Sequence, residues 1–143
     1  MSVMDDDAVL VDMRPSSGLR LGASGLFGVL AIGGVYVAFT TSPLGGIVIA
    51  VSSVLMGLGF NRQQIVVTRR EVRVLSAYRV RPLVVPSADA DEFVWVRNSR
   101  GQKRVVLHRR DGRSTPGVFL GHADQPVMDA QLAELNAALP SQT

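Results

Sequence analysis

Cysteine is absent from the 143-residue chain, and histidine occurs only twice, as His108 and His122. The lack of cysteine excludes disulfides, thiolate metal ligands and cysteine nucleophiles. The sequence also lacks a G-x-S-x-G elbow, a Walker loop and the H-E-x-x-H zinc motif. His108 falls inside a strand-like pattern and His122 directly precedes a helical one, which favours structural roles for both. We predict that the protein is not an enzyme and has no catalytic residue, metal site or cofactor.

Carboxylates are also sparse, and Asp89, Asp91 and Glu92 form the one acidic cluster beyond the N-terminal segment. Paired carboxylates can act as general acid and base, but acids in a solvated loop are far more common. His122 has only Asp124 close to it, which is too few ligands for a metal ion. We therefore interpret these residues as parts of loops.

Charge is missing altogether from the 41 residues between Arg20 and Arg62. A transmembrane helix needs about 20 mostly apolar residues, so this run suits two spans. The alternative is a pair of buried helices in a soluble protein, but such helices usually keep a polar stripe. The absence of ionisable residues also argues against transport of protons or ions through the spans.

The only polar break in this run lies at residues 40–43. Ser42 can cap a helix, and Pro43 suits a first turn because its missing N–H is not needed there. The sequence therefore predicts an antiparallel transmembrane hairpin made of Leu21–Thr40 and Pro43–Phe60, within a segment 21–61.

Basic residues flank the hairpin on one side only. Arg14 and Arg20 precede it, four arginines follow closely after it, and the connecting loop is uncharged. Loops rich in Lys and Arg stay cytoplasmic, so we expect a two-pass protein with both termini in the cytoplasm. Four aspartates before the first span make a cleavable signal peptide an unlikely interpretation.

Residues 1–20 are expected to form a cytoplasmic tail. Chain termini are poorly ordered by default, which favours disorder for this tail. The alternative is that the short apolar strip Val9–Met13 docks on a partner.

Small residues are abundant in the first span and let helix backbones approach closely in lipid. They fall on more than one face of the helix. A single neighbouring helix cannot contact all of these faces. We therefore expect the hairpin to pack against an integral membrane protein complex or against a second copy of this chain. The candidate helix-packing residues are Gly18, Gly22, Ser24, Gly28, Gly34 and Ala38.

Residues 62–143 are predicted to form a small, mainly β domain that ends in a helix. Apolar residues alternate with polar ones, a pattern typical of half-buried strands. Asp124 can cap the final helix, whose stripe of Met128, Leu132, Leu135 and Leu139 ends at Pro140. The expected strands are Gln63–Thr68, Glu71–Leu75, Tyr78–Val85 (an edge strand, or one with a bulge, because of Pro82), Glu92–Arg97, Gln102–Arg109 and Arg113–Gly121, with hairpin turns at Asn98–Gly101 and Asp111-Gly112.

The β domain carries an excess of arginine, for which three interpretations remain open: a solvated outer face, attraction to an anionic lipid surface, or nucleic-acid binding. The last is disfavoured because few aromatic residues are available to stack on bases, so we expect no nucleic-acid partner. The residues expected to face lipid or a partner are Arg62, Arg69, Arg70, Arg73, Arg79 and Arg81.

The hairpin, the Val-rich strands, the turn Val-Thr-Arg-Arg-Glu-Val (Val67–Val72) and the final amphipathic helix together resemble the bacterial pleckstrin-homology-like membrane proteins. This resemblance covers nearly the whole chain and rests on architecture. It implies a bent antiparallel sheet or partly open barrel, capped by the C-terminal helix, at the bacterial inner membrane. Relatives of this kind include assembly factors of photosynthetic complexes in purple bacteria, and the family carries no catalytic residues.

Taken together, these patterns predict a non-enzymatic, membrane-anchored interaction module. Its role would be that of an accessory or assembly subunit that stabilises a larger bacterial membrane protein complex, photosynthetic or respiratory. The alternative is a domain that binds or senses anionic lipid at the cytoplasmic face.

Overall fold

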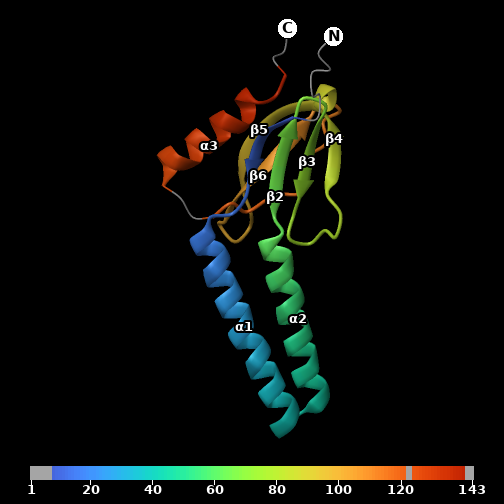
Figure 1. Cartoon of the computed structure of the whole chain (residues 1–143), viewed down its shortest axis with the longest axis vertical. Helices are drawn as coiled ribbons and strands as arrows, with labels where there is room; N and C mark the ends of the chain where they lie inside the picture. The colour runs from blue at the N-terminus through green and yellow to red at the C-terminus, as the bar shows by residue number, and fades with distance from the viewer. Residues whose placement is uncertain (1–7, 122–123, 141–143) are drawn as a thin grey trace.

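The computed structural model describes residues 8–121 and 124–140, which leaves His122 and the aspartates at positions 5–7 outside the described residues. Two long helices form an antiparallel pair at one end of the molecule, and strands with a third helix form a β-domain at the other (Figure 1). The elements are β1 (Val9–Met13), α1 (Ser17–Thr40), α2 (Pro43–Asn61), β2 (Gln64–Thr68), β3 (Glu71–Leu75), β4 (Leu83–Pro86), a 3-10 turn η1 (Ser87–Asp89), β5 (Ala90–Arg97), β6 (Lys103–Arg109) and α3 (Gln125–Ala137).

Both predicted spans are helical, and within the described residues they are the two helices long and apolar enough to cross a membrane. The Ser42 hydroxyl accepts a hydrogen bond from Gly45 N at 3.3 Å, and Pro43 occupies the first turn of α2, as predicted. Helix α1 begins at Ser17 instead of Leu21, because the Ser16 hydroxyl caps it by accepting from Leu19 N.

Strand β1 corrects the expectation of a disordered tail for residues 9–13. It pairs antiparallel with β2, with Met13 opposite Ile65 and Val11 opposite Val67, and the side chains of Val11 and Met13 are buried. The helical hairpin is thus inserted between two neighbouring strands of one sheet (Figure 1). Because both ends of the hairpin return to that sheet, they lie on the same side of the molecule.

The first sheet has the strand order β1-β2-β3-β4. The strand expected at Tyr78–Val85 is shorter, since residues 76–82 form a loop and β4 starts only at Leu83. Pro82 lies just before β4, and β4 is an edge strand, as predicted from this proline. We call residues 76–82 the junction loop, because they run beside the end of α2 (Figure 1).

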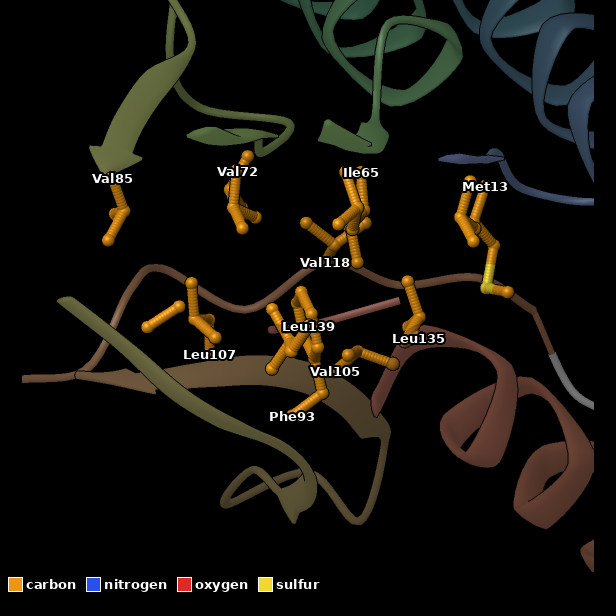
Figure 2. Close-up of a cluster of buried hydrophobic side chains, with 14 of the residues drawn as sticks. Met13, Ile65, Val72, Val85, Phe93, Val105, Leu107, Val118, Leu135 and Leu139 are labelled. Atoms are coloured by element: carbon orange, nitrogen blue, oxygen red, sulfur yellow. The ribbon is translucent and has the colours of Figure 1, made fainter. Parts of the chain in front are cut away.

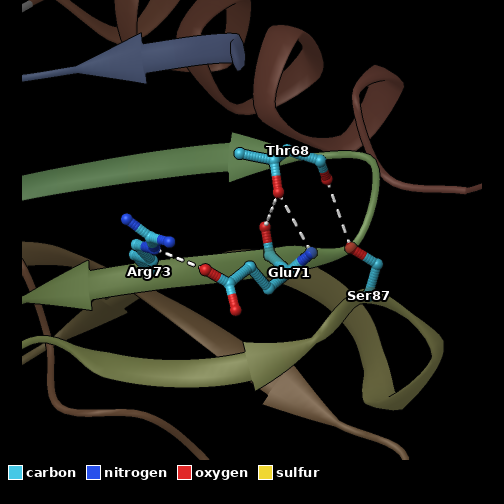
Figure 3. Close-up of polar contacts among 4 residues, drawn as sticks. All are labelled: Thr68, Glu71, Arg73 and Ser87. Atoms are coloured by element: carbon cyan, nitrogen blue, oxygen red, sulfur yellow. Dashed lines mark hydrogen bonds and ion pairs between the residues drawn. The ribbon is translucent and has the colours of Figure 1, made fainter. Parts of the chain in front are cut away.

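The turn between β2 and β3 lies at the end of the sheet away from the helices. The Thr68 hydroxyl accepts from Glu71 N at 3.1 Å and donates to Glu71 O at 2.9 Å, which closes the turn (Figure 3). The Ser87 hydroxyl donates to Thr68 O at 3.2 Å and ties η1 to the same turn (Figure 3). The Val-Thr-Arg-Arg-Glu-Val segment is therefore a turn into a second strand, as expected.

Strands β5 and β6 form a separate two-stranded sheet. Gly101 adopts a φ of 77° in the turn between them, and Gly112 one of 80° in the turn after β6, so both predicted turns are present. The final expected strand, Arg113–Gly121, is reduced to two isolated bridges, Val105 with Val118 and His108 with Ser114. This segment contains Pro116, which lacks the N–H that a regular ladder requires.

The core lies between the two sheets and α3. Figure 2 shows side chains of the first sheet, such as Ile65 and Val72, facing those of the second sheet and α3, such as Phe93 and Leu135. The predicted stripe of α3 is confirmed: Met128, Leu135 and Leu139 are buried, and Leu132 packs against the core.

The ends of α3 differ in detail from the prediction. Asp124 occupies the N-cap position, but its side chain makes no capping hydrogen bond. The helix is fixed instead through Asn136, whose side-chain oxygen accepts from Phe93 N at 2.7 Å and whose amide donates to Phe93 O at 3.1 Å. The described strands form two small antiparallel sheets and not a closed barrel.

Candidate membrane-interface site

The end of α2 is fixed to the β-domain by buried contacts. The ring of Phe60 packs against that of Phe119, with centroids 5.8 Å apart and planes inclined by 59°. Gln63, two residues beyond the end of α2, is only 2% exposed, and its side-chain oxygen accepts from Phe119 N at 2.9 Å. An amide buried in this way needs a hydrogen-bond partner, and here the partner sets the direction in which α2 leaves the domain.

The end of α1 is held to the same place. Ser16 N donates to Leu120 O at 3.4 Å, just before the helix begins. The side-chain amide of Asn61 donates to the Ser24 hydroxyl at 2.8 Å and links the two helices. Ser24, predicted as a packing residue, therefore contacts the end of α2 by a hydrogen bond.

The closest packing between the helix backbones is at Gly34 and Ala38 of α1, opposite Gly46 and Ala50 of α2. A Cβ added at Gly34 would lie 2.6 Å from Ala50 N, and one at Gly46 would overlap the backbone of Ala38. Glycine at these two positions therefore permits the backbones to approach. Of the predicted packing residues, Gly34 and Ala38 pack within the hairpin, and Ser24 accepts a hydrogen bond within it.

The remaining glycines of α1 do not contact α2. A Cβ added at any of them would meet no atom within 4 Å. At about 100° per residue, Gly22 and Gly25 lie on the side of the helix opposite Gly34. We call this surface the outer glycine face: Gly18, Gly22, Gly25, Gly28 and Gly33.

The predicted basic residues are divided between the two ends of the β-domain. Arg69 and Arg70 lie in the turn that is away from the helices, and Arg73 lies on β3, where it pairs with Glu71. Arg62 caps α2, and Arg79 and Arg81 lie in the junction loop, next to the helices. The six arginines thus do not form one continuous surface.

Three arginines at the helix end of the domain have no acidic partner among the described residues. Within residues 8–121 and 124–140, Arg62, Arg79 and Arg81 form no ion pair. Arg14, by contrast, pairs with Asp12 at 3.0 Å, and Gln64 donates to the same carboxylate at 2.7 Å. The hydrogen bond from Arg14 lowers the pKa of Asp12 below its ordinary value, with a smaller contribution from Gln64.

A cavity of about 400 Å³ lies between the junction loop and the two helices. Its walls are mainly apolar, with Phe27 from α1, Met56 from α2 and Val80 from the loop, and Arg62 and Arg79 border it. Gly59 lets the loop come this close, because a Cβ there would collide with the carbonyl oxygen of Ala77. We call this cavity the junction pocket.

Sequence reasoning missed the junction pocket. The alternation from Tyr78 to Arg81 predicted a strand, whereas Tyr78 and Val80 are 79% and 87% exposed in a loop. The available signal was Pro82, which cannot donate to a sheet ladder. Phe60, near the end of α2, lines the pocket as well.

No group of three or more histidine or acidic side chains that could hold a metal ion occurs among the described residues. No protein-family model, curated protein or solved structure matches the chain. What is established of the architecture is therefore a pair of long apolar helices joined to a small antiparallel domain with a C-terminal helix.

Proposed function

We propose that the chain is a two-pass protein of the bacterial inner membrane, with the hairpin in lipid and the β-domain in the cytoplasm. The support comes from exposed apolar surface: in the most apolar windows of α1 and α2, only 6% and 17% of the residues are buried. Core helices of a soluble protein would be covered, and apolar surface of this extent needs lipid or a partner. Arg14, Arg20 and Arg62 lie at the domain end of the hairpin, the side that the positive-inside rule assigns to the cytoplasm.

Within that membrane, we propose a non-enzymatic interaction module, an accessory or assembly subunit that stabilises a larger complex. The observation that carries this proposal is the outer glycine face, which α2 leaves uncovered. In lipid, helices associate through van der Waals contact, and small residues four apart, such as Gly18 and Gly22, permit the closest approach. The partner is a transmembrane helix of an integral membrane protein, or α1 of a second copy.

For the β-domain we propose a pleckstrin-homology-like fold that is partly open. Two small antiparallel sheets enclose one core, and α3 covers it, with Asn136 binding the backbone of Phe93 in β5. Such a domain would hold the partner complex from the cytoplasmic side while the hairpin holds it in the membrane.

The test is purification of the tagged full-length chain from its native membrane in mild detergent, followed by mass spectrometry. We expect a stable partner, or a dimer, that is lost in a Gly22→Leu/Gly25→Leu variant because the added side chains prevent close approach. Val48→Leu, at an exposed position of α2 away from this face, is the matched control and should retain the partner. Recovery of the wild-type chain as a monomer without a partner would refute the proposal.

The second candidate is a domain that binds the anionic lipid surface. It is favoured by Arg62, Arg79 and Arg81, which lie at the helix end of the β-domain without acidic partners among the described residues. The full chain in nanodiscs of anionic lipid should show slower amide exchange in residues 76–82 than in zwitterionic nanodiscs. The difference should shrink as salt is raised, and equal exchange in both lipids would exclude this candidate.

A further inference from the structure

A second, polar cavity adjoins the junction pocket. It measures about 370 Å³ and is lined by Arg14, Asn61, Gln63 and Gln64, among others. Arg62 and Val80 line both cavities. The apolar junction pocket and the polar cavity thus meet at Arg62 and Val80.

We propose that these two cavities together bind one anionic glycerophospholipid. An acyl chain would lie in the junction pocket, against Phe27, Met56 and Phe60, and the phosphate would lie at Arg62, with Arg79 at the rim. This inference rests on the proposed membrane location of the hairpin, because the cavities lie at the end of the helices where lipid headgroups would be.

Charge complementarity selects this occupant. Neither cavity is lined by an aspartate or a glutamate. Arg62 and Arg79 have no ion-pair partner in the part of the chain that the structure describes, so each guanidinium can donate to phosphate oxygens. Arg14 is less available because Asp12 already pairs with it at 3.0 Å.

The form of the site also fits a lipid better than a free anion. A phosphate ion would use the arginines but leave the apolar walls of the larger cavity unoccupied. Tyr78 and Val80 project from the junction loop and are mostly exposed, and tyrosine is enriched at the membrane–water interface, where its ring meets acyl chains and headgroups together. An apolar segment of a protein partner would use the walls but not the unpaired arginines.

Native mass spectrometry of the detergent-solubilised full chain tests the proposal, with dioleoyl phosphatidylglycerol, dioleoyl phosphatidylcholine and inorganic phosphate as probes. We expect one phosphatidylglycerol per chain, weaker binding of phosphatidylcholine, and no competition by inorganic phosphate. The Arg62→Gln/Arg79→Gln variant should lose roughly tenfold in phosphatidylglycerol affinity, the effect of losing charge-assisted hydrogen bonds. Val80→Glu, which alters an exposed side chain shared by both cavities, should lower the affinity as well.

The matched control is Arg69→Gln/Arg113→Gln, which removes the same charge from exposed positions away from the helices and should bind as the wild type does. Equal phosphatidylglycerol affinity in the pocket variant and the control would overturn the site, as would equal binding of both lipids. Displacement of the lipid by phosphate alone would overturn the acyl-chain part.

The partner assay separates the two proposals: the pocket variant should retain the partner, and loss of the partner with unchanged lipid binding would show a protein-docking surface instead.

Discussion

Met13 and Ile65 lie opposite each other in the antiparallel pairing of β1 and β2, although the entire helical hairpin separates them in the chain. The hairpin therefore takes the place of the turn that ordinarily joins two neighbouring strands. Pairing of β1 with β2 sets the spacing between the ends of α1 and α2, and it requires both ends to lie on the same side of the molecule. Segment 9–13 is thus part of the β-domain.

A charge placed in β1 should unfold the β-domain. Val11 is 8% exposed and Val9 is 58% exposed on the same strand, so Val11→Asp buries an unpaired carboxylate and Val9→Asp does not. We expect Val11→Asp to cost on the order of 3–5 kcal/mol, as for an uncompensated buried charge, and Val9→Asp at most about 0.5 kcal/mol. Fluorescence of the single tryptophan, Trp95, during thermal unfolding in detergent measures both. Equal midpoints would show that β1 is not part of the fold.

The insertion of the hairpin between paired strands, together with the proposed cytoplasmic location of the β-domain, predicts a definite labelling pattern. The chain has no cysteine, so Thr41→Cys at the hairpin tip and Ser99→Cys in the β5–β6 turn each introduce a unique exposed thiol. A membrane-impermeant maleimide should label Thr41→Cys in intact spheroplasts and Ser99→Cys only after permeabilisation. The reverse pattern would contradict the orientation, and labelling of both from one side would contradict the two spans.

Features that depend on local sequence were predictable. The caps at Ser42 and Pro43, the apolar stripe of α3 and the glycine turns each follow from the chemistry of a few adjacent residues. Strand β1 was not predictable in this way, because Val9–Met13 is short and its partner strand follows the hairpin. Its ladder bonds depend on a distant segment.

The candidate site was less predictable than the fold. Alternation over Tyr78–Arg81 is the same whether the residues form a strand or an exposed loop. Apart from Pro82, only packing against α2 distinguishes the two. The junction pocket combines side chains of α1, α2 and the junction loop. Its arginines were identified as candidates from composition, but the division of the six arginines between two ends of the domain follows from the direction of β2 and β3.

Replacement of a hairpin glycine should disturb the pairing of the helices. In Gly46→Leu, the new side chain would overlap the backbone of Ala38 and Gly34, so the helices must separate. We expect a loss of about 1–3 kcal/mol, the range for overpacking, measured as a lower unfolding temperature of the hairpin by circular dichroism. Gly22→Leu lies on the outer glycine face and should leave this temperature unchanged. A similar loss in both variants would contradict the observed helix contact.

The ion pair of Arg14 with Asp12 should be visible in an acid titration. Because Arg14 lowers the pKa of Asp12, the stabilisation is fully present above the ordinary pKa of the unfolded chain and is lost as the pH falls through the lower folded-state pKa. Both side chains are partly exposed, so the contribution to stability is small. Carboxyl NMR of Asp12 should show its pKa rising in Arg14→Gln, where only the hydrogen bond from Gln64 remains. An unchanged pKa would exclude the ion pair in solution.

The attachment of α3 depends on one side-chain amide. Asn136 accepts from Phe93 N and donates to Phe93 O, so it satisfies both backbone groups of a residue that is almost completely buried. Asn136→Leu keeps a similar volume but leaves both groups unpaired, and we expect a loss of about 1–3 kcal/mol. The Trp95 side chain donates to Met128 O at 3.1 Å, so its fluorescence reports directly on the docking of α3.

Glu134→Gln, on the exposed side of the helix, is the control and should unfold as the wild type does. If Asn136→Leu also unfolded at the wild-type temperature, the core contacts of Leu135 and Leu139 alone would suffice to hold the helix, and the amide would not be required.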